Sequence, residues 1–266
     1  MVTYQIKSMP SSTKIAIVAA LEREVHSLVK EWQVRQREFA GRNFRFYENG
    51  NATVVCSGIG QDAARRATEA VIALYNPGTV FSVGFAGAVD GSLQVGALVN
   101  PARVIDAKDG SVVNTRGGQG TLVSVSRVAD AAQKARLAEL YSAVAVDMEA
   151  VAVARVAGAH DVAFEAVKVI SDEHDAKLSS MAEFILEDGR FRAAAFGFHV
   201  AFRPWLWTSV IELARNSAKA AAVLANQLAG AIASGVRADK IDKPQPLQHQ
   251  TSDELVAAHS GEKANR

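Results

Sequence analysis

The segment Ala143–Asp175, AVAVDMEAVAVARVAGAHDVAFEAVKVISDEHD, constrains the fold of this chain more than any other stretch. Two of its parts, Ala143–Val146 and Ala163–Ile170, are apolar runs of the length and composition of buried strands. Between them, Ala150–Ala157 is typical of a buried helix, and Gly158 is suited to end that helix. A strand, a helix and a second strand in this order predict a βαβ unit with parallel strands.

An acidic turn follows each of the two predicted strands. The first is Asp147-Met148-Glu149 and the second is Ser171-Asp172-Glu173-His174-Asp175. In open α/β sheets, ligands bind beyond the carboxyl ends of the strands. A single carboxylate before a helix often only caps its N-terminus or interacts with its dipole. Two acidic turns at the same edge favour an acidic pocket, because like charges gathered without a ligand repel each other.

The DMEA and VISD motifs in these turns resemble those of the nucleoside phosphorylase superfamily, in particular its methylthioadenosine/S-adenosylhomocysteine nucleosidases. The resemblance implies that Glu149 binds the ribose hydroxyls, with Met148 packed on the sugar or serving only the core. It also implies that Asp172 faces the purine and supplies or stabilises the proton that N7 needs when adenine leaves. We expect its neighbour Ser171 to line the substrate site as well.

A second resemblance to these nucleosidases lies near the N-terminus. The apolar run Lys14–Ala20 predicts a buried strand, and Leu21-Glu22-Arg23-Glu24-Val25 then opens a helix that is expected to reach about Trp32. In the nucleosidases, the last Glu of an A-[ML]-x-x-E-[IV] turn activates the attacking water. That residue matches Glu24. Glu22 and Glu24 in a first helical turn could also be mere partners of the helix dipole.

Glycine-rich turns provide two more points of resemblance. A predicted hairpin of Phe39–Glu48 and Ala52–Cys56 around Asn49-Gly50 leads to Ser57-Gly58-Ile59-Gly60 and the predicted helix Gln61–Tyr75. This SGIG turn resembles a family motif, although any tight strand–helix turn could have the same letters.

The strand Thr79–Val83 leads into Gly84–Ala88, which resembles the family's G-x-x-G-[GA] loop and places Ala86 and Gly87 at the substrate. The next strand is predicted over Ala97–Ile105, with Ala97 where the family usually has Asp.

The residues around this loop favour water over phosphate as the acceptor of the sugar. Phosphorylases of the superfamily hold phosphate with an Arg before the loop and a Ser within it, whereas this chain has Ser82 and Phe85 at those places. A dianion is hard to bind without a cationic or hydroxyl donor at its main contacts. Hydrolysis is therefore expected, and a phosphorylase that uses other residues remains an alternative.

The base pocket departs from the nucleosidase pattern. After the polar stretch Asp106–Gly120, the sequence predicts a strand over Gly120–Val125 and a helix over Ala131–Leu140. The nucleosidases carry an aromatic residue here that stacks on adenine, and the best match in this chain is Val128. The base pocket is thus expected to be altered or to be completed by other residues.

Beyond Asp175 the resemblance weakens. A helix is predicted over Ser179–Leu186 and another from Pro204 to about Ala233. The aromatic stretch Phe191–Trp207 is suited to the core and a dimer interface. It is also suited to an apolar lid or a membrane-surface patch, as in a hopanoid-associated branch of the superfamily that removes adenine from a lipid nucleoside.

Composition bounds the remaining possibilities. The chain has 266 residues, 49% of them hydrophobic, a formal net charge of +1 and one cysteine, Cys56. These values are typical of one domain with a sizeable core, and they give no basic field for nucleic acid and no intramolecular disulfide. The six histidines show no zinc-ligand spacing. The N-terminus lacks the apolar core of a signal peptide, and no run of about 18 apolar residues predicts a membrane span.

These observations predict an α/β fold with a single domain, residues 14–234, and a mixed central β-sheet flanked by helices. Residues 235–266 are polar and predict a flexible tail. The resemblance implies a cytoplasmic, homodimeric purine nucleosidase that needs no metal or organic cofactor and releases adenine from a 5′-substituted nucleoside. A non-catalytic nucleoside-binding protein is a further alternative, which Glu24, Glu149 and Asp172 disfavour. The sequence does not define the 5′ substituent.

Overall fold

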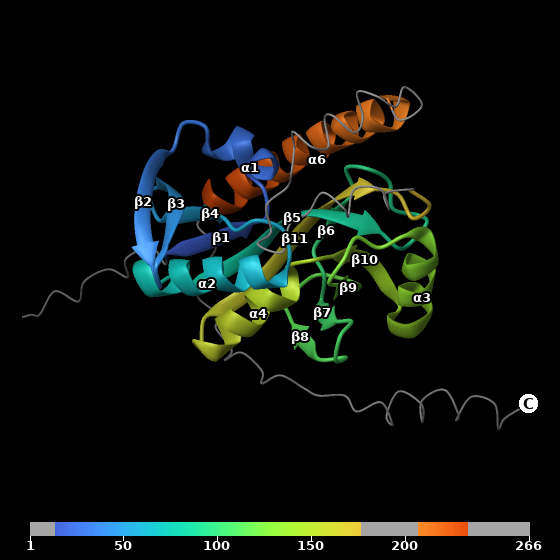
Figure 1. Ribbon diagram of the computed structural model, residues 1–266, viewed down its shortest axis with the longest axis horizontal. Coiled ribbons are helices and arrows are strands. Elements are labelled where there is room, and N and C mark those ends of the chain that lie inside the picture. The colour runs from blue at the N-terminus through green and yellow to red at the C-terminus, as the bar shows by residue number, and fades with distance from the viewer. Residues whose placement is uncertain (1–13, 177–206, 234–266) are drawn as a thin grey trace, which may run out of the picture.

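The structure is a computed structural model that describes residues 14–176 and 207–233 (Figure 1). The predicted leader before residue 14, the predicted helix Ser179–Leu186, the aromatic stretch up to residue 206 and the predicted tail from residue 235 lie outside the described residues.

A single mixed sheet of eleven strands runs through the described residues and confirms the predicted fold class. Its strand order is β2-β3-β4-β1-β5-β10-β9-β7-β8, and β11 pairs with both β5 and β6. The central pairs β4–β1, β1–β5 and β5–β11 are parallel, whereas β2–β3, β3–β4 and β5–β10 are antiparallel. The strands are β1 (Ile15–Ala19), β2 (Gln33–Phe39), β3 (Arg42–Asn49), β4 (Ala52–Cys56), β5 (Thr79–Ala88), β6 (Leu98–Val99), β7 (Arg103–Asp106), β8 (Val112–Asn114), β9 (Thr121–Ser124), β10 (Ala143–Asp147) and β11 (Ala163–Asp172).

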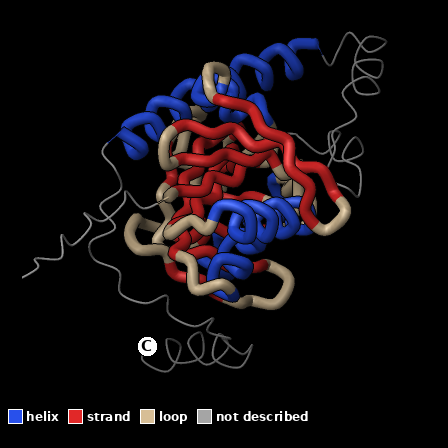
Figure 2. Tube along the Cα trace, turned by 90° about the vertical axis from the view of Figure 1, so that its left-hand side faces the viewer, coloured by secondary structure: helices blue, strands red, loops and turns tan. Residues whose placement is uncertain are grey.

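Helices cover both faces of the sheet (Figures 1 and 2). On one face α1 packs against α6, and on the other α2 packs against α4. α3 lies beside β9 and β10 at the end of the molecule. The helices are α1 (Glu22–Val29), α2 (Gln61–Tyr75), α3 (Ala131–Tyr141), α4 (Ala150–Ala159) and α6 (Trp207–Ala233).

The core is divided by the sheet into two main apolar clusters. One joins α2 and α4 to the sheet, and the other joins α1 and α6 to the opposite face. The sequence AVAVARVAGA of α4 is apolar on nearly all sides, as is expected for a helix between a sheet and a second helix. In α6, Ala220, Leu224 and Leu228 are buried at helical spacing and anchor its inner face.

The structure corrects the predicted βαβ unit. β11 is parallel to β5, but β10 is antiparallel to β5, so the two strands of the predicted unit do not form a parallel pair. α4 also runs through Gly158 to Ala159 and therefore does not end where the glycine suggested. β11 continues through Ser171 and Asp172, so this part of the second acidic turn is strand.

Two other predicted boundaries are also wrong, one because of strand pairing and one because of a proline. The predicted loop Gly84–Ala88 is the second half of β5, because it pairs with both β11 and β10. The predicted strand Ala97–Ile105 is divided into β6 and β7. Pro101 lies between them, and proline lacks the N–H that a continuous ladder needs.

The sequence prediction also missed an edge hairpin. The helix expected to reach Trp32 ends at Val29, and the polar strand β2 follows and pairs with β3. Ala40 and Gly41 form the two-residue turn between them, both with positive φ, as tight hairpins require.

Candidate active site

The carboxyl ends of β10 and β11 meet at one residue of β5. Val146 pairs with Gly87 in the antiparallel direction, and Asp172 is the parallel partner of the same Gly87. Because a residue in a sheet has one neighbouring strand on each side, β10 and β11 flank the end of β5. The predicted gathering of the two acidic turns is therefore confirmed, although it arises from convergence on β5 and not from a parallel βαβ pair.

A pocket of about 170 Å³ opens where these strands end. All the residues that sequence analysis assigned to the site line this pocket. They are Glu24, Ala86, Gly87, Val128, Met148, Glu149, Ser171 and Asp172. The pocket therefore unites residues from five separate parts of the chain, and it also contains residues that the sequence did not single out.

Glu24 lies at the start of α1, directly after β1. Its Oε2 accepts hydrogen bonds from the backbone N–H groups of Ala20 at 3.1 Å and Leu21 at 3.0 Å, and its Oε1 lies 3.5 Å from the backbone N of Phe85. Burial raises the pKa of Glu24, while the N–H groups of Leu21 and Phe85 and the positive charge of Lys168 act in the opposite direction. A buried carboxylate with increased proton affinity is suited to act as a general base.

The backbone at Gly84 makes room for this carboxylate. A Cβ at Gly84 would lie 2.9 Å from Oε2 of Glu24, and φ at Gly84 is +134°. Both the close approach and the backbone conformation require glycine. Gly84 therefore helps to determine where Glu24 lies.

Glu149 lies at the N-terminus of α4. Its Oε1 accepts a hydrogen bond from the backbone N–H of Gly60 at 2.7 Å, which gives the predicted SGIG turn a contact in the site. Its Oε2 accepts a longer one, 3.3 Å, from the backbone N–H of Met148. Burial and the adjacent negative charge of Asp147 raise the pKa of Glu149 to about 7.

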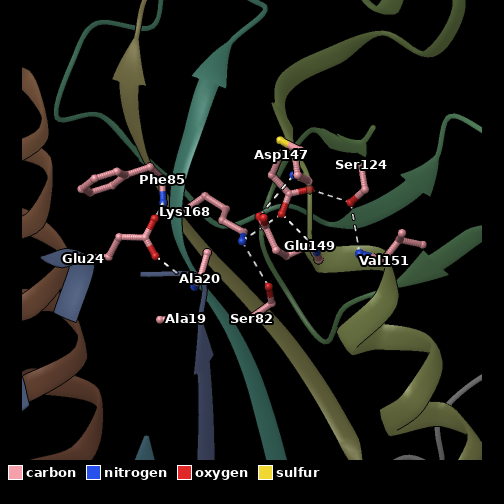
Figure 3. A network of polar contacts seen from close by, with 12 residues as sticks. Ala19, Ala20, Glu24, Ser82, Phe85, Ser124, Asp147, Glu149, Val151 and Lys168 are labelled. Atoms are coloured by element: carbon pink, nitrogen blue, oxygen red, sulfur yellow. Dashed lines mark hydrogen bonds and ion pairs between the residues drawn. The ribbon is translucent and has the colours of Figure 1, made fainter. Parts of the chain in front are cut away.

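Lys168 of β11 lies between Glu24 on one side and Asp147 and Glu149 on the other (Figure 3). Its Nζ is 2.9 Å from Oδ2 of Asp147 and donates to Oγ of Ser82 at 3.1 Å. Burial acts against the charged form, but the carboxylates of Asp147 and Glu149 outweigh it and raise the pKa of Lys168. Lys168 therefore places a positive charge next to the buried carboxylates of the pocket.

Asp147 is a structural centre of this network and not only a residue of an acidic turn. Its Oδ1 accepts from Oγ of Ser124 at 2.5 Å, and its Oδ2 accepts from the backbone N–H of Ala150 at 2.9 Å (Figure 3). The same Ser124 hydroxyl accepts from the N–H of Val151. Asp147, at the end of β10, thus binds the first N–H group of α4 and links this helix to β9 and β11, and this places Glu149 at the pocket.

Asp172, at the end of β11, has a charged partner that the sequence did not reveal. Its Oδ2 lies 2.6 Å from Nζ of Lys134 in α3, and its Oδ1 accepts from Oγ of Ser171 at 2.8 Å. Nζ of Lys134 also donates to the backbone carbonyl of Glu173 at 2.7 Å. The carboxylate predicted to face the purine is thus held in a buried ion pair.

Sequence reasoning missed both buried lysines. Lys168 had a signal, because a single lysine inside the apolar run AFEAVKVI needs a buried charged partner. Lys134 had a weaker one, since its helix AAQKARLAELY shows little contrast between an apolar and a polar face. In neither case could the sequence supply the partner, which lies 21 residues away for Lys168 and 38 for Lys134.

Within residues 14–176 and 207–233, no group of three or more His, Cys, Asp or Glu side chains is placed to hold a metal ion. In the same residues, no helix is both long and apolar enough to cross a membrane.

Comparison with known proteins identifies the family. The family model described as "Phosphorylase superfamily" matches residues 14–121 and 118–201. The chain belongs to the phosphorylase superfamily. The match includes every segment that contributes the acidic groups of the pocket.

Two curated relatives match a shorter part of the chain. The 5′-methylthioadenosine/S-adenosylhomocysteine nucleosidases of Lysinibacillus sphaericus and Marinomonas sp. are 35% and 33% identical to it over 89 residues. These matches cover 32% of this chain and span about two fifths of the relatives' length, 39% and 38%.

Solved structures with the same fold cover much more of the chain. A mutant of the Helicobacter pylori nucleosidase with 5′-methylthioadenosine in its active site aligns with a TM-score of 0.64 and 18% identity, over 84% of this chain and 99% of that one. The Neisseria meningitidis nucleosidase in complex with methylthio-immucillin-A has the same TM-score and coverage at 20% identity. Futalosine hydrolase of Helicobacter pylori aligns equally well, at 17% identity. At these identities the likeness establishes the fold.

Proposed function

We propose that this protein is a purine nucleosidase that hydrolyses the N-glycosidic bond of a 5′-substituted adenine nucleoside and releases adenine. The observation that carries the proposal is that Glu24, Glu149 and Asp172 line one pocket. They come from α1, the start of α4 and the end of β11. The names of the curated relatives, which are nucleosidases acting on 5′-methylthioadenosine and S-adenosylhomocysteine, support this substrate class.

The three acidic groups match the three needs of the reaction. Cleavage of a ribosyl–adenine bond passes through a sugar with oxocarbenium character, which water then attacks. Glu24 would take a proton from that water, as its buried position and raised pKa favour. Glu149 would accept hydrogen bonds from the ribose hydroxyls, and Asp172 would face the purine.

Water, and not phosphate, is the proposed acceptor. Ser82 is fully buried and its hydroxyl is hydrogen bonded to Lys168, while Phe85, which is among the lining residues of the pocket, has no side-chain donor for phosphate. Lys168 is itself ion-paired with Asp147 and is therefore not free to bind phosphate. The observation that favours a phosphorylase instead is that two arginines, Arg23 and Arg127, are among the residues that line the pocket.

A single assay separates these alternatives. Purified protein is incubated with 5′-methylthioadenosine in phosphate-free buffer and with added phosphate, and adenine and the sugar product are quantified. Hydrolysis predicts equal rates of adenine release in both buffers and a free sugar product. A rate that rises with phosphate, together with a sugar 1-phosphate, would identify a phosphorylase. Binding without any adenine release would identify a nucleoside-binding protein.

A lipid nucleoside of the adenosylhopane type is the second candidate substrate. Leu213 and Ser217 of α6 line the pocket, and Ile211, two residues before Leu213 along the helix, has 51% of its surface exposed. Leu213 gives the pocket an apolar residue that a long apolar 5′ group could contact, and the exposed Ile211, on another side of the same helix, would offer an apolar contact to a membrane surface. Adenine release from a panel of nucleosides with methylthio, homocysteinyl and long alkyl groups at the 5′ carbon tests this choice.

We also propose that the enzyme is a cytoplasmic homodimer with one domain, residues 14–234. The single cysteine suits a reducing compartment, and homodimers are the expectation from the resemblance to the nucleosidases. Sedimentation of the purified chain would give a mass of twice 28.3 kDa. A monomer mass at assay concentrations would contradict the dimer, and cell fractionation tests the location.

A further inference from the structure

Lys134 is a buried cation at the pocket that the mechanism above does not use. Its side chain has 2% of its surface exposed, yet it lines the pocket and contacts Asp172 and the carbonyl of Glu173. Removing an ammonium group from water is unfavourable unless charged and polar partners compensate for it. The buried position of Lys134 therefore indicates that its charge has a function at the pocket, unlike the charge of an exposed surface lysine.

Gly87 provides the space in which this ion pair forms. A Cβ at Gly87 would lie 2.8 Å from Oδ2 of Asp172 and 3.1 Å from Nζ of Lys134. Any larger residue would have to push the two charged groups apart. The carboxylate of Asp172 and the ammonium group of Lys134 therefore lie together next to Gly87, at the same part of the pocket.

The ion pair leaves hydrogen-bonding capacity for a ligand. An ammonium group has three donors, and within the described residues Lys134 uses two of them, on Asp172 and on the carbonyl of Glu173. A carboxylate has about four acceptor sites, and Asp172 uses one for Lys134 and one for Ser171. Among the described residues, one donor of Lys134 and about two acceptor sites of Asp172 therefore remain for a ligand at the wall of the pocket.

We propose that Lys134 is the catalytic proton donor to N7 of the leaving purine, while Asp172 holds Lys134 in place and accepts a hydrogen bond from the 6-amino group. This inference rests on the proposed nucleosidase function. The N7 and 6-amino groups of adenine form an acceptor next to a donor, which complements Lys134 and Asp172. In this arrangement Asp172 is not itself the acid.

The step balances as follows. The bond between C1′ and N9 breaks, and its electron pair passes into the purine as N7 receives a proton from Nζ of Lys134. Adenine leaves neutral, and the ribosyl cation takes the oxygen of water, whose proton goes to Glu24. Lys134 regains a proton from solvent as Glu24 loses one, so the net reaction consumes only nucleoside and water.

The same arrangement determines the base. A 6-oxo purine presents an acceptor oxygen where adenine has an amino group, and that oxygen would face the carboxylate of Asp172. Sites built for a specific donor discriminate strongly against analogues that lack it. We therefore expect 6-amino purine nucleosides to be cleaved at least about 100-fold faster, in kcat/KM, than their 6-oxo counterparts.

The test compares two leaving groups in the full chain. 5′-Methylthioadenosine needs a proton on its leaving base, whereas the p-nitrophenolate of p-nitrophenyl β-D-ribofuranoside leaves as a stable anion. Lys134→Met should lower kcat on 5′-methylthioadenosine by roughly 100-fold or more and change kcat/KM on the p-nitrophenyl riboside by less than about 3-fold. Lys30→Met, which removes an exposed lysine, is the matched control and should behave as wild type on both.

Two outcomes would overturn the inference: kcat on 5′-methylthioadenosine within about 3-fold of wild type in folded Lys134→Met, or equal losses on both substrates. The equal losses would indicate a purely structural lysine. If Lys134→Met does not fold, Asp172→Asn is compared with Asp172→Asn/Lys134→Met, since neither variant leaves the carboxylate of Asp172 without its cation and the double variant has no unpaired charge from this pair. The lysine is then the acid only if the double variant is the slower of the two on 5′-methylthioadenosine.

A binding measurement decides the case if wild type does not cleave the p-nitrophenyl riboside. The 7-deaza analogue of 5′-methylthioadenosine has a C–H in place of the N7 acceptor. Lys134→Met should leave its inhibition constant within about 3-fold of wild type, since no hydrogen bond to N7 is lost. A large loss of affinity for the 7-deaza analogue would contradict the assignment. Failure of wild type to release adenine from any adenine nucleoside would instead refute the proposed function, before any variant is made.

Discussion

Nζ of Lys168 lies 2.9 Å from Oδ2 of Asp147, and both side chains are almost completely buried. This ion pair joins β11 to the end of β10, just before α4, and lies next to Glu149 (Figure 3). Because Glu24 and Glu149 are also buried and acidic, Lys168 is the cation that offsets three neighbouring carboxylates. The stability of the pocket should therefore depend on it.

Lys168→Met should destabilise the protein strongly. It leaves the buried carboxylate of Asp147 without its partner, which typically lowers the free energy of unfolding by about 3–5 kcal/mol. Chemical denaturation measures the change, with exposed Lys30→Met as a control expected to stay within about 0.5 kcal/mol of wild type. Lys168→Met/Asp147→Asn should recover part of the loss. A change below about 1 kcal/mol in Lys168→Met would show that the pair is not needed for stability.

Glu24→Gln should fold and bind nucleoside but lose turnover. The substitution keeps the shape and length of the side chain and removes its basicity. We therefore expect kcat to fall by roughly 100-fold or more, with little change in stability. The control is Glu22→Gln, two residues earlier, whose carboxylate forms an exposed ion pair with Arg45 and does not line the pocket. Near-normal kcat in Glu24→Gln would show that another group activates the water.

Gly84→Ala should impair the same step from a different position. The added Cβ would lie 2.9 Å from Oε2 of Glu24, and alanine at φ +134° is strained. We expect a loss of roughly 1–3 kcal/mol in the free energy of unfolding and a lower kcat. In α4, a Cβ at Gly158 would meet no atom within 4 Å, so Gly158→Ala should instead stabilise the helix by about 0.5–1 kcal/mol. Equal effects of the two substitutions on kcat would contradict the proposed close approach.

Much of the site could be predicted because its acidic residues occur in short motifs beside recognisable strands. Glu24, Glu149 and Asp172 each follow an apolar run, and all three line the pocket. The direction of β10 could not be predicted, because a strand–helix–strand order does not specify which strand each partner pairs with. β10 pairs with the far end of β5, a segment that sequence analysis treated as a loop.

The cations of the site could not be predicted for a related reason. A buried lysine is stable only with its partners, and the partners of Lys134 and Lys168 come from elements far away in the sequence. The edge strand β2 was missed because its residues are mostly exposed and polar, so it lacks the apolar alternation that marks a half-buried strand. These features depend on tertiary contacts and not on local pattern.

The proposed role of Glu149 predicts discrimination by the sugar. A buried carboxylate that loses a hydroxyl partner costs about 1–3 kcal/mol. Wild type should therefore use 5′-methylthio-2′-deoxyadenosine roughly tenfold or more less efficiently, in kcat/KM, than 5′-methylthioadenosine. In Glu149→Gln the gap between the two substrates should become smaller. Equal use of both sugars by wild type would count against a ribose-binding role.

The raised pKa of Glu149 also predicts how stability depends on pH. Burial and the charge of Asp147 raise this pKa from 4.5 to about 7 in the folded protein, whereas the unfolded chain has the ordinary value. Between these two values the folded state keeps a proton that the unfolded state has released, so the free energy of unfolding decreases as pH rises from about 4.5 to 7. The contribution is fully present below the lower value and lost above the higher one.

Glu149→Gln removes this titration. The wild type should therefore lose stability relative to the variant across the same window, by at most roughly 3 kcal/mol at about 1.4 kcal/mol per pKa unit. Using the difference between the two proteins cancels the contribution of Glu24, whose raised pKa acts in the same direction. Urea unfolding at intervals between pH 4.5 and 7.5 measures the difference. If it does not change with pH, the carboxyl group of Glu149 is ionised as easily in the folded protein as in the unfolded chain, and Lys168 and the N–H of Gly60 fully compensate for its burial.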